Sequence, residues 1–206
     1  MTGRRVAGVV LAAGAGRRFG GPKALVRGTP DGPTLVEQAV CRVADSGVGL
    51  VVVVVGAESA PVIEVLGSGA WALRRATAHD VEVDLVEADD WVEGMGASLR
   101  SGIAVLVDRR HVTASLITLV DLPDLTTAVH ERVIGAAGDG PAALVRATYD
   151  GMPGHPVLIG RDHWAGVMEV ATGDRGARDY LRQHEPALVE CGDLATGRDV
   201  DRPTDL

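Results

Sequence analysis

Aromatic residues and cysteines are scarce in this chain. Phenylalanine, tryptophan and tyrosine together make up 3% of its 206 residues, so a hydrophobic core must be built mainly from valine, leucine and alanine. The two cysteines, Cys41 and Cys191, are too few for a disulfide framework and indicate reduced thiols inside a cell. The length suits one sizeable domain, so we expect a single domain spanning residues 1–206.

The chain also lacks a surplus of positive charge and a long apolar run. Its net charge of −8 argues against a nucleic-acid partner, because nucleic-acid surfaces rely on basic patches that neutralise phosphates. A polar lead, Met1 to Arg5, is followed by an apolar run that ends at Gly14, which is too short for a membrane span and unlike a signal peptide. We therefore expect a cytoplasmic protein with no membrane partner.

One stretch near the start combines glycines with cations. The apolar run from Val6 to Ala13 predicts a buried strand. The loop after it holds four glycines and three cations, namely Gly14, Gly16, Gly20, Gly21, Arg17, Arg18 and Lys23. Glycines let backbone N–H groups approach a ligand closely, and a strand end places those groups at the carboxyl edge of a sheet. The sequence therefore predicts a phosphate-binding loop.

The spacing within this loop excludes two common phosphate motifs. A Walker loop has lysine directly after its last glycine, whereas Gly21 is followed by Pro22. The dinucleotide fingerprint requires a third glycine where Phe19 stands. The pattern L-A-A-G-x-G-x-R-x-G-x-P-K-x-L, from Leu11 to Leu25, instead resembles the signature of nucleotidyltransferases that activate sugars and cofactors. The competing interpretation is a glycine-rich surface turn with solvated arginines.

Strand and helix patterns alternate along the rest of the chain. Apolar runs and alternating patterns predict strands at residues 50–55, 81–86, 116–120, 142–147, 156–159 and 187–189. Helical spacing predicts helices at 34–46, where Thr34 is the cap, and at 60–66, 97–108, 126–137 and 177–183. This order indicates an α/β fold with one doubly wound, mostly parallel sheet, whose ligands collect at the carboxyl ends of the strands.

Two further segments carry residues suited to a metal or a nucleotide. Asp121 directly follows a predicted buried strand, and a carboxylate there suits Mg²⁺, although an Asp can also simply begin a turn. In the stretch 90–102, Gly94 and Gly96 precede Ser98 at a predicted helix start, where free N–H groups could bind a phosphate or a base edge. The alternative there is that Ser98 caps the helix and Arg100 is solvated.

Two motifs in the second half suit an acceptor substrate. In GHPV, residues 154–157, His155 stands between Gly154 and Pro156, which predicts a turn at a cleft. In GDRGAR, residues 173–178, Asp174 and two arginines surround a glycine, and the arginines could bind an anion or cap a helix. A lone histidine is more often structural, so neither motif decides its role alone.

Taken together, these motifs resemble one particular family. LAAGxGxRxG with Lys23, WxxGMxxSLRxG, VDLP, GHPV, GDRGAR and a terminal DVDxPxDL are similar to those of the molybdenum cofactor cytidylyltransferases. The resemblance runs from Val6 to Leu206 and implies a Rossmann-like nucleotidyltransferase fold. It also implies transfer of CMP from CTP to the phosphate of molybdopterin with release of pyrophosphate, Mg²⁺ (or Mn²⁺) as the cofactor, and transient contact with a molybdoenzyme or its chaperone.

The resemblance also implies roles for individual residues. Arg18 and Lys23 would act on the phosphates, and Asp121 and Asp201 would bind the metal. The nucleotide would lie against Leu11, Ala12, Ala13, Gly14, Ala15, Gly16, Lys23, Gly96 and Ser98. The acceptor would lie against His155, Asp174 and Arg178.

Several alternatives stay open at the level of sequence. Guanylyltransferases of the same cofactor usually carry L-A-G-G where this chain has L-A-A-G, so Ala13 favours CTP. Gly16, Phe19 and Arg202 depart from the residues usual in the family, which leaves the substrate open. A sugar or isoprenoid-precursor nucleotidyltransferase is the first rival, and a non-catalytic NTP-binding module for cofactor insertion is the second. The joint presence of Arg18, Lys23 and Asp121 argues against the second.

Overall fold

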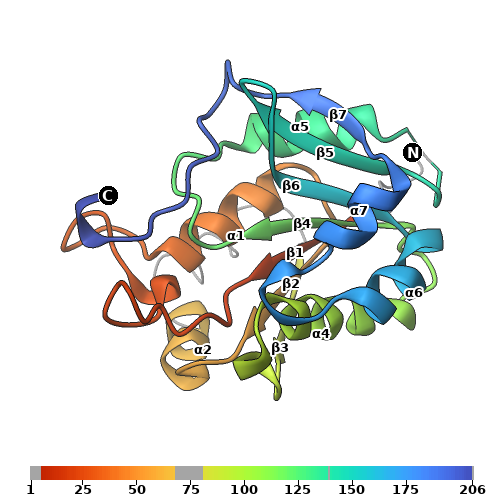
Figure 1. Cartoon of the computed structure of the whole chain (residues 1–206). Coiled ribbons are helices and arrows are strands. Elements are labelled where there is room, and N and C mark those ends of the chain that lie inside the picture. The colour runs from red at the N-terminus through yellow and green to blue at the C-terminus, as the bar shows by residue number, and fades with distance from the viewer. Residues whose placement is uncertain (1–5, 68–80, 139, 206) are drawn as a thin grey trace.

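A seven-stranded sheet forms the centre of the protein (Figure 1). The computed structural model describes residues 6–67, 81–138 and 140–205. The strands are β1 (Val6–Leu11), β2 (Leu50–Val55), β3 (Glu82–Glu87), β4 (Ala114–Leu119), β5 (Leu144–Tyr149), β6 (Met152–Gly160) and β7 (Ala187–Glu190). Both the polar lead, residues 1–5, and Leu206 of the terminal motif lie outside the described residues.

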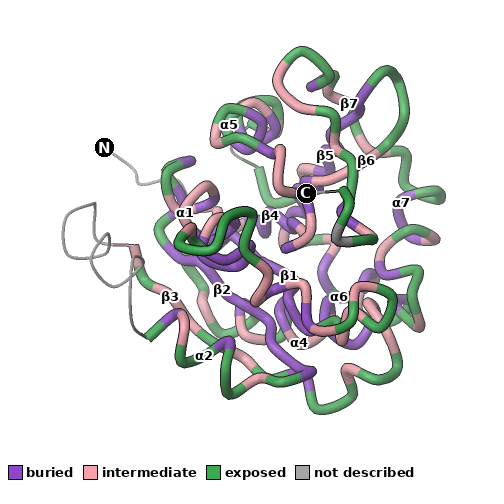
Figure 2. The backbone as a smooth tube through the Cα atoms, turned by 90° about the vertical axis from the view of Figure 1, so that its left-hand side faces the viewer, coloured by how far each residue is buried: buried purple, intermediate pink, exposed green. Residues whose placement is uncertain are grey.

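The strand order is β3-β2-β1-β4-β6-β5-β7. β6 runs antiparallel to both β4 and β5, and the other neighbouring strands are parallel. β1 and β2 are the most apolar runs of the sequence, and they lie in the interior of the sheet (Figure 2). The predicted α/β fold with a mostly parallel sheet is confirmed.

Helices cover both faces of the sheet. Apolar side chains of α1 (Leu35–Asp45), α2 (Ser59–Gly67) and α5 (Thr127–Ala136) form one core layer. Those of α4 (Met95–Val107), α6 (Arg161–Val170) and α7 (Arg178–His184) form the other. β1 separates the layers, because Val10 belongs to the first and Val9 to the second. Within the described parts of the chain, no helix is long and apolar enough to cross a membrane.

Two glycines set how closely the helices approach β1. A Cβ atom at Gly8 would overlap Val43 of α1, and a Cβ atom at Gly102 of α4 would overlap Val9. α1 itself begins as predicted, because Thr34 and Glu37 form a capping box in which each side chain accepts a hydrogen bond from the other residue's backbone N–H. Close packing on both faces fixes the strand whose end carries the glycine-rich loop.

The structure corrects one prediction, excludes one alternative and adds one helix. His155 is not on a turn but within β6. The pairing of β6 with β5 is irregular between Arg146 and Thr148, opposite the segment Gly154–Pro156. This irregularity accommodates Pro156, which has no N–H to donate to a neighbouring strand. Ser98 does not cap α4, because the helix already begins at Met95 with Gly94 as its cap. The sequence analysis also did not predict α6, which buries Trp164 and Val167 at helical spacing.

Candidate functional site

The glycine-rich loop lies at the carboxyl edge of β1. The N–H of Ala12 donates to Val54 O, and Ala13 O accepts from the N–H of Ala57, so the loop starts from a backbone fixed against β2 and the segment after it. Gly16 has a φ of 56°, and its carbonyl accepts hydrogen bonds from the N–H groups of Phe19, Gly20 and Gly21. Any side chain at position 16 would strike the backbone of Gly21, so the tight turn depends on glycine.

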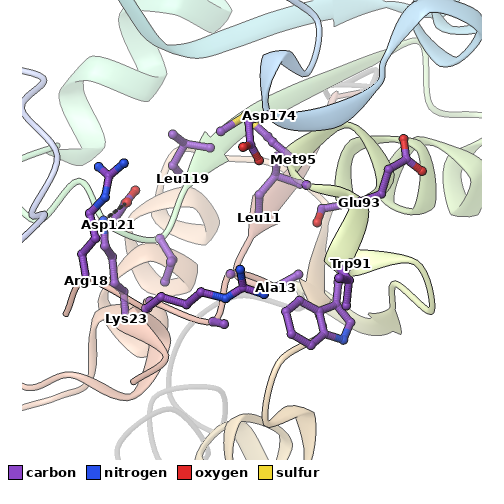
Figure 3. A pocket seen from close by; sticks show the side chains of 18 of the residues that line it. Leu11, Ala13, Arg18, Lys23, Trp91, Glu93, Met95, Leu119, Asp121 and Asp174 are labelled. Atoms are coloured by element: carbon purple, nitrogen blue, oxygen red, sulfur yellow. Dashed lines mark hydrogen bonds and ion pairs between the residues drawn. The ribbon is translucent and has the colours of Figure 1, made fainter. Parts of the chain in front are cut away.

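Three charged side chains from distant parts of the chain meet beside this loop. Lys23 Nζ donates to Asp121 Oδ2 at 2.8 Å and to Asp201 Oδ1 at 3.0 Å. Lys23 begins the short 3-10 helix η1 (Lys23–Leu25), Asp121 follows β4, and Asp201 comes from the C-terminal segment. Arg18 approaches the same group, with Nη1 3.7 Å from Asp201 Oδ2. Figure 3 shows Arg18, Lys23 and Asp121 on one side of the cavity.

The electrostatics of this cluster follow from partial burial and close pairing. The side chains of Lys23 and Asp121 are 15% and 19% exposed, whereas that of Asp201 is 48% exposed. Burial lowers the pKa of Lys23, but hydrogen bonds and charges from both aspartates outweigh it, so the pKa is raised overall. The hydrogen bond and charge of Lys23 lower the pKa of Asp201. Lys23 and Asp201 are therefore both ionised at neutral pH.

The donor set of this cluster fits a divalent cation. Two carboxylates, Asp121 and Asp201, converge on one cationic point, the Lys23 ammonium. Mg²⁺ is typically bound by one or two carboxylates together with substrate phosphates and waters, so a third protein ligand is not needed. Across residues 6–67, 81–138 and 140–205, no group of three or more His, Cys, Asp or Glu side chains is arranged to hold a metal.

A cavity of about 470 Å³ opens next to the cluster. Seven of the predicted nucleotide-binding residues line it: Leu11, Ala13, Gly14, Ala15, Gly16, Lys23 and Ser98. The other two lie elsewhere, because Ala12 belongs to the core layer under α1 and Gly96 packs against the backbone of Ala171 and Thr172. Arg18, Asp121, Asp174 and Asp201 also line the cavity.

Sequence reasoning missed the wall opposite the glycine-rich loop. Trp91, Glu93 and Met95 line the cavity, and Figure 3 shows Trp91 beside Ala13. A Cβ atom at Gly56 would come within 2.9 Å of both Trp91 and Ala13, so the ends of β1 and β2 and the tryptophan are tightly packed. The available signal was the pattern W-x-x-G-M at residues 91–95, which the sequence analysis relates only to the start of a helix.

A second cavity, of about 380 Å³, adjoins the first. Leu11, Met95, Leu119 and Asp174 line both. The predicted acceptor residues His155, Asp174 and Arg178 all line the second cavity, although they come from β6, the short 3-10 helix η3 (Gly173–Arg175) and α7. The structure therefore brings these three residues together.

Burial controls the charges in the second cavity. Burial, with a smaller effect from the charge of Arg146, lowers the pKa of His155 to about 4, so the imidazole is neutral at pH 7. Arg146 of β5 also lines this cavity, and its Nε donates to Gly154 O at 3.1 Å. Sequence reasoning missed Arg146, and the signal was a cation within an otherwise apolar strand.

The loop that carries Asp174 is held against the start of α4. Gly94 has a φ of 123°, and a Cβ atom there would strike Asp174 and the backbone of Gly173. Arg100 is half-exposed and pairs with Glu93, with Nη2 2.6 Å from Glu93 Oε2, and it also donates to Ala171 O. These contacts fix the boundary between the two cavities.

The fold and the site define a class of protein. A mostly parallel sheet with a glycine-rich loop after β1, and with a lysine between two carboxylates beside that loop, characterises a nucleotidyltransferase. The chain belongs to the family of the MobA-like NTP transferase domain, whose family model matches residues 8–187. The coarse prediction of a nucleotidyltransferase fold and family is thereby confirmed.

Individual relatives refine this assignment. A nicotine blue oxidoreductase from Paenarthrobacter nicotinovorans is 35% identical over 206 residues, covering 95% of this chain and 92% of the relative. A nucleotidyl transferase from Methanothermobacter has a TM-score of 0.75 at 22% identity and covers 97% of this chain and 93% of that one, which supports the fold alone. Rv0371c from Mycobacterium tuberculosis H37Rv, in complex with manganese, has a TM-score of 0.65 at 25% identity, with coverage of 95% and 93%.

Proposed function

We propose that this protein transfers CMP from CTP to the phosphate of molybdopterin and releases pyrophosphate. An oxygen of the acceptor phosphate attacks the α-phosphorus of CTP, a new P–O–P link forms, and the bond between the α-phosphorus and the oxygen leading to the β-phosphorus breaks. The observation that carries the proposal is the cluster of Lys23, Asp121 and Asp201 at the mouth of the first cavity. Such transfers depend mainly on positioning and charge neutralisation.

The first cavity would take the nucleotide. The backbone of Gly14 to Gly16 would approach the phosphates, Arg18 would bind the leaving β- and γ-phosphates, and Lys23 would bind the α-phosphate. Asp121 and Asp201 would hold Mg²⁺ or Mn²⁺, which on binding would neutralise charge on the phosphate oxygens. Lys23 already contacts both carboxylates. A change in its side-chain conformation would let the ammonium move from a carboxylate oxygen to a phosphate oxygen.

The second cavity would take the acceptor. His155, Asp174 and Arg178 line it, and Arg146 adds a second cation suited to an anionic group. Because Leu11, Met95 and Asp174 line both cavities, an acceptor phosphate and the nucleotide α-phosphate would meet at their boundary. Ala13 supports cytosine over guanine, since its methyl group lines the first cavity and narrows it. A cytoplasmic location and transient contact with a molybdoenzyme or its chaperone follow from this function.

Pyrophosphate release tests the proposal. The protein is incubated with each of the four NTPs and Mg²⁺ or Mn²⁺, with and without molybdopterin. We expect release with CTP that depends on both molybdopterin and the metal. Release with GTP as the preferred nucleotide would overturn the cytidylyl assignment, and release with a sugar phosphate or isoprenoid precursor instead of molybdopterin would replace the acceptor. Binding of NTP with no release under any condition would indicate a non-catalytic module.

A second candidate function is an oxidoreductase that acts on a heteroaromatic compound. It is supported by the 35% identity to the nicotine blue oxidoreductase over nearly the whole length of both chains. Loss of absorbance of a reduced nicotinamide dinucleotide in the presence of nicotine blue would reveal this activity. Lys23→Ala separates the two functions, because nucleotidyl transfer needs the cation at the phosphate, whereas reduction of a ring in the second cavity does not.

A further inference from the structure

The last described segment of the chain carries one of the two carboxylates of the cluster without being a strand or α-helix. We call residues 191–205 the C-terminal strap. It leaves β7, passes the turn after β4 and ends in the short 3-10 helix η4 (Pro203–Asp205). Asp201 lies on this strap, and its side chain is 48% exposed. Exposed ion pairs contribute little stability, so the contact with Arg18, whose side chain is 84% exposed, adds little to the hold of Lys23 on the strap.

Two contacts fix the strap to one turn of the sheet. At one end, Asp124 Oδ2 accepts hydrogen bonds from both the N–H and the hydroxyl of Thr196, each at 2.6 Å. At the other end, the N–H of Val200 donates to Asp121 O at 2.9 Å. Asp121 and Asp124 belong to the same turn, which Pro123 stiffens. The turn that carries one carboxylate of the cluster therefore also holds the segment that carries the other.

The surroundings of Asp124 favour this contact. The charge of Arg42 on α1 acts on Asp124, and Arg42 is itself held by Gln38 through a hydrogen bond of 2.9 Å. Next to Thr196, Gly197 has a φ of 65° and packs against the ring of Tyr149 so closely that a Cβ atom would overlap it. Asp124 and Thr196 line neither of the two cavities, so neither is placed to touch a substrate.

We propose that Asp124 is a positioning residue, which holds Thr196 so that the strap places Asp201 beside Asp121 and Lys23. The inference rests on the proposed nucleotidyl transfer for its effect on activity, but the attachment of the strap can be measured without any substrate. When the Asp124–Thr196 contact is lost, the strap keeps the Val200 N–H bond, the buried Val200 side chain and the packing of Gly197 on Tyr149, but Thr196 is no longer tied to the turn. Asp201 then spends less time at the cluster. Asp121 would then hold the metal with Asp201 beside it for a smaller fraction of the time.

The experiment compares four variants of the full chain with the wild type. Asp124→Ala removes both hydrogen bonds, Thr196→Val removes the hydroxyl donor, and Thr196→Ser keeps it. Thr126→Val is the matched control, because Thr126 is exposed, lies two residues from Asp124 and makes no side-chain capping bond. Trypsin cleavage after the exposed Arg198 is followed by mass spectrometry at increasing Mn²⁺, because the Arg202–Pro203 bond resists trypsin. Pyrophosphate release is then measured against Mn²⁺ and CTP, and melting temperatures confirm folding.

We expect faster cleavage at Arg198 in Asp124→Ala and Thr196→Val, and protection by Mn²⁺ only at higher concentration. The Mn²⁺ concentration for half-maximal pyrophosphate release should rise about tenfold, while the KM for CTP changes far less. Tenfold is the lower end of the loss in metal affinity that follows when a residue supporting a metal ligand is removed. Thr196→Ser and Thr126→Val should match the wild type. Unchanged cleavage and metal requirement in Asp124→Ala would overturn the proposal, as would a loss of activity that follows melting temperature alone. If the wild type releases no pyrophosphate, the proposed function fails, and cleavage with Mn²⁺ protection still decides the role of Asp124.

Discussion

At the scale of single residues, Lys23 is the centre of the site. Its ammonium donates hydrogen bonds to both carboxylates, and its side chain is largely shielded from solvent. Removing it would leave two carboxylates close together without a counter-charge, so its loss affects both the charge balance of the cluster and phosphate binding.

Lys23→Ala should reduce turnover by about a hundredfold or more, because a preorganised cation at the phosphates is lost. Circular dichroism should show an unchanged fold, and the melting temperature should fall only slightly, since the core layers do not involve this side chain. The measurement is kcat for pyrophosphate release. A variant as active as the wild type would remove Lys23 from the mechanism.

Asp121→Asn keeps the shape of the side chain but removes a charge from the pair that would hold the metal. Activity should fall and should return in part at high Mg²⁺ or Mn²⁺, because excess metal compensates for weaker binding. Titrating metal against pyrophosphate release checks this expectation. Activity that is insensitive both to the substitution and to a chelator would contradict the metal role.

Ala13 is the residue through which base choice can be examined. Ala13→Gly removes one methyl group from the lining of the first cavity and recreates the L-A-G-G sequence of guanylyltransferases. The ratio of kcat/KM for GTP to that for CTP should rise by no more than about a hundredfold, since one methyl group is worth about 1–3 kcal/mol. The packing of Trp91 beside Ala13 means that a complete switch would also need changes near Trp91. An unchanged ratio would show that this methyl group does not contribute to selectivity.

At the scale of elements, Glu190 at the end of β7 holds the β5–β6 hairpin. Its carboxylate accepts hydrogen bonds from the Thr148 hydroxyl and from the N–H groups of Asp150, Gly151 and Gly192. These bonds, led by that from the Gly192 N–H, lower the pKa of Glu190 from 4.5 to about 2. The hairpin leads directly to Gly154 and His155, so this carboxylate supports one wall of the second cavity.

The depressed pKa of Glu190 predicts a pH-dependent contribution to stability. A lowered folded-state pKa means that the stabilisation is complete above about pH 4.5 and is lost as the pH falls towards 2. Urea unfolding of the wild type and Glu190→Gln should therefore differ at pH 7, and the difference should shrink between pH 4.5 and pH 2. A difference in unfolding free energy that stays constant from pH 4.5 to pH 2 would show that the ionised carboxylate of Glu190 does not cause the stabilisation.

At the scale of the whole molecule, the site is assembled from segments that are far apart in sequence. Lys23 and Asp201 are separated by 178 residues, and they meet because β1 and β4 are neighbours in the sheet and the strap crosses the turn after β4. A chain ending at Val200 would keep both core layers, the Asp124–Thr196 contact and the Val200 N–H bond to Asp121 O, but lose Asp201. We expect it to fold, with a melting temperature close to that of the full chain, and to lose nearly all pyrophosphate release. Comparable activity in the shortened protein would show that Asp201 is dispensable.

The sequence by itself determined the parts of this protein that depend on local pattern. The run of β-branched residues at Leu50–Val55 could only be a buried strand, Thr34 and Glu37 specified a helix start, and the spacing from Leu11 to Leu25 indicated the phosphate loop. The strand position of His155 was not predicted, because it depends on an irregular partner strand, and α6 was not predicted although Trp164 and Val167 have helical spacing. Only the tertiary structure decided which charges meet. Periodicity in a sequence shows which face of a single helix or strand is buried. It does not show strand order or the path of the last residues across the sheet. These two features determine the pairing of Lys23 with Asp121 and Asp201, the place of Arg146 in the second cavity and the contact of Asp124 with the strap.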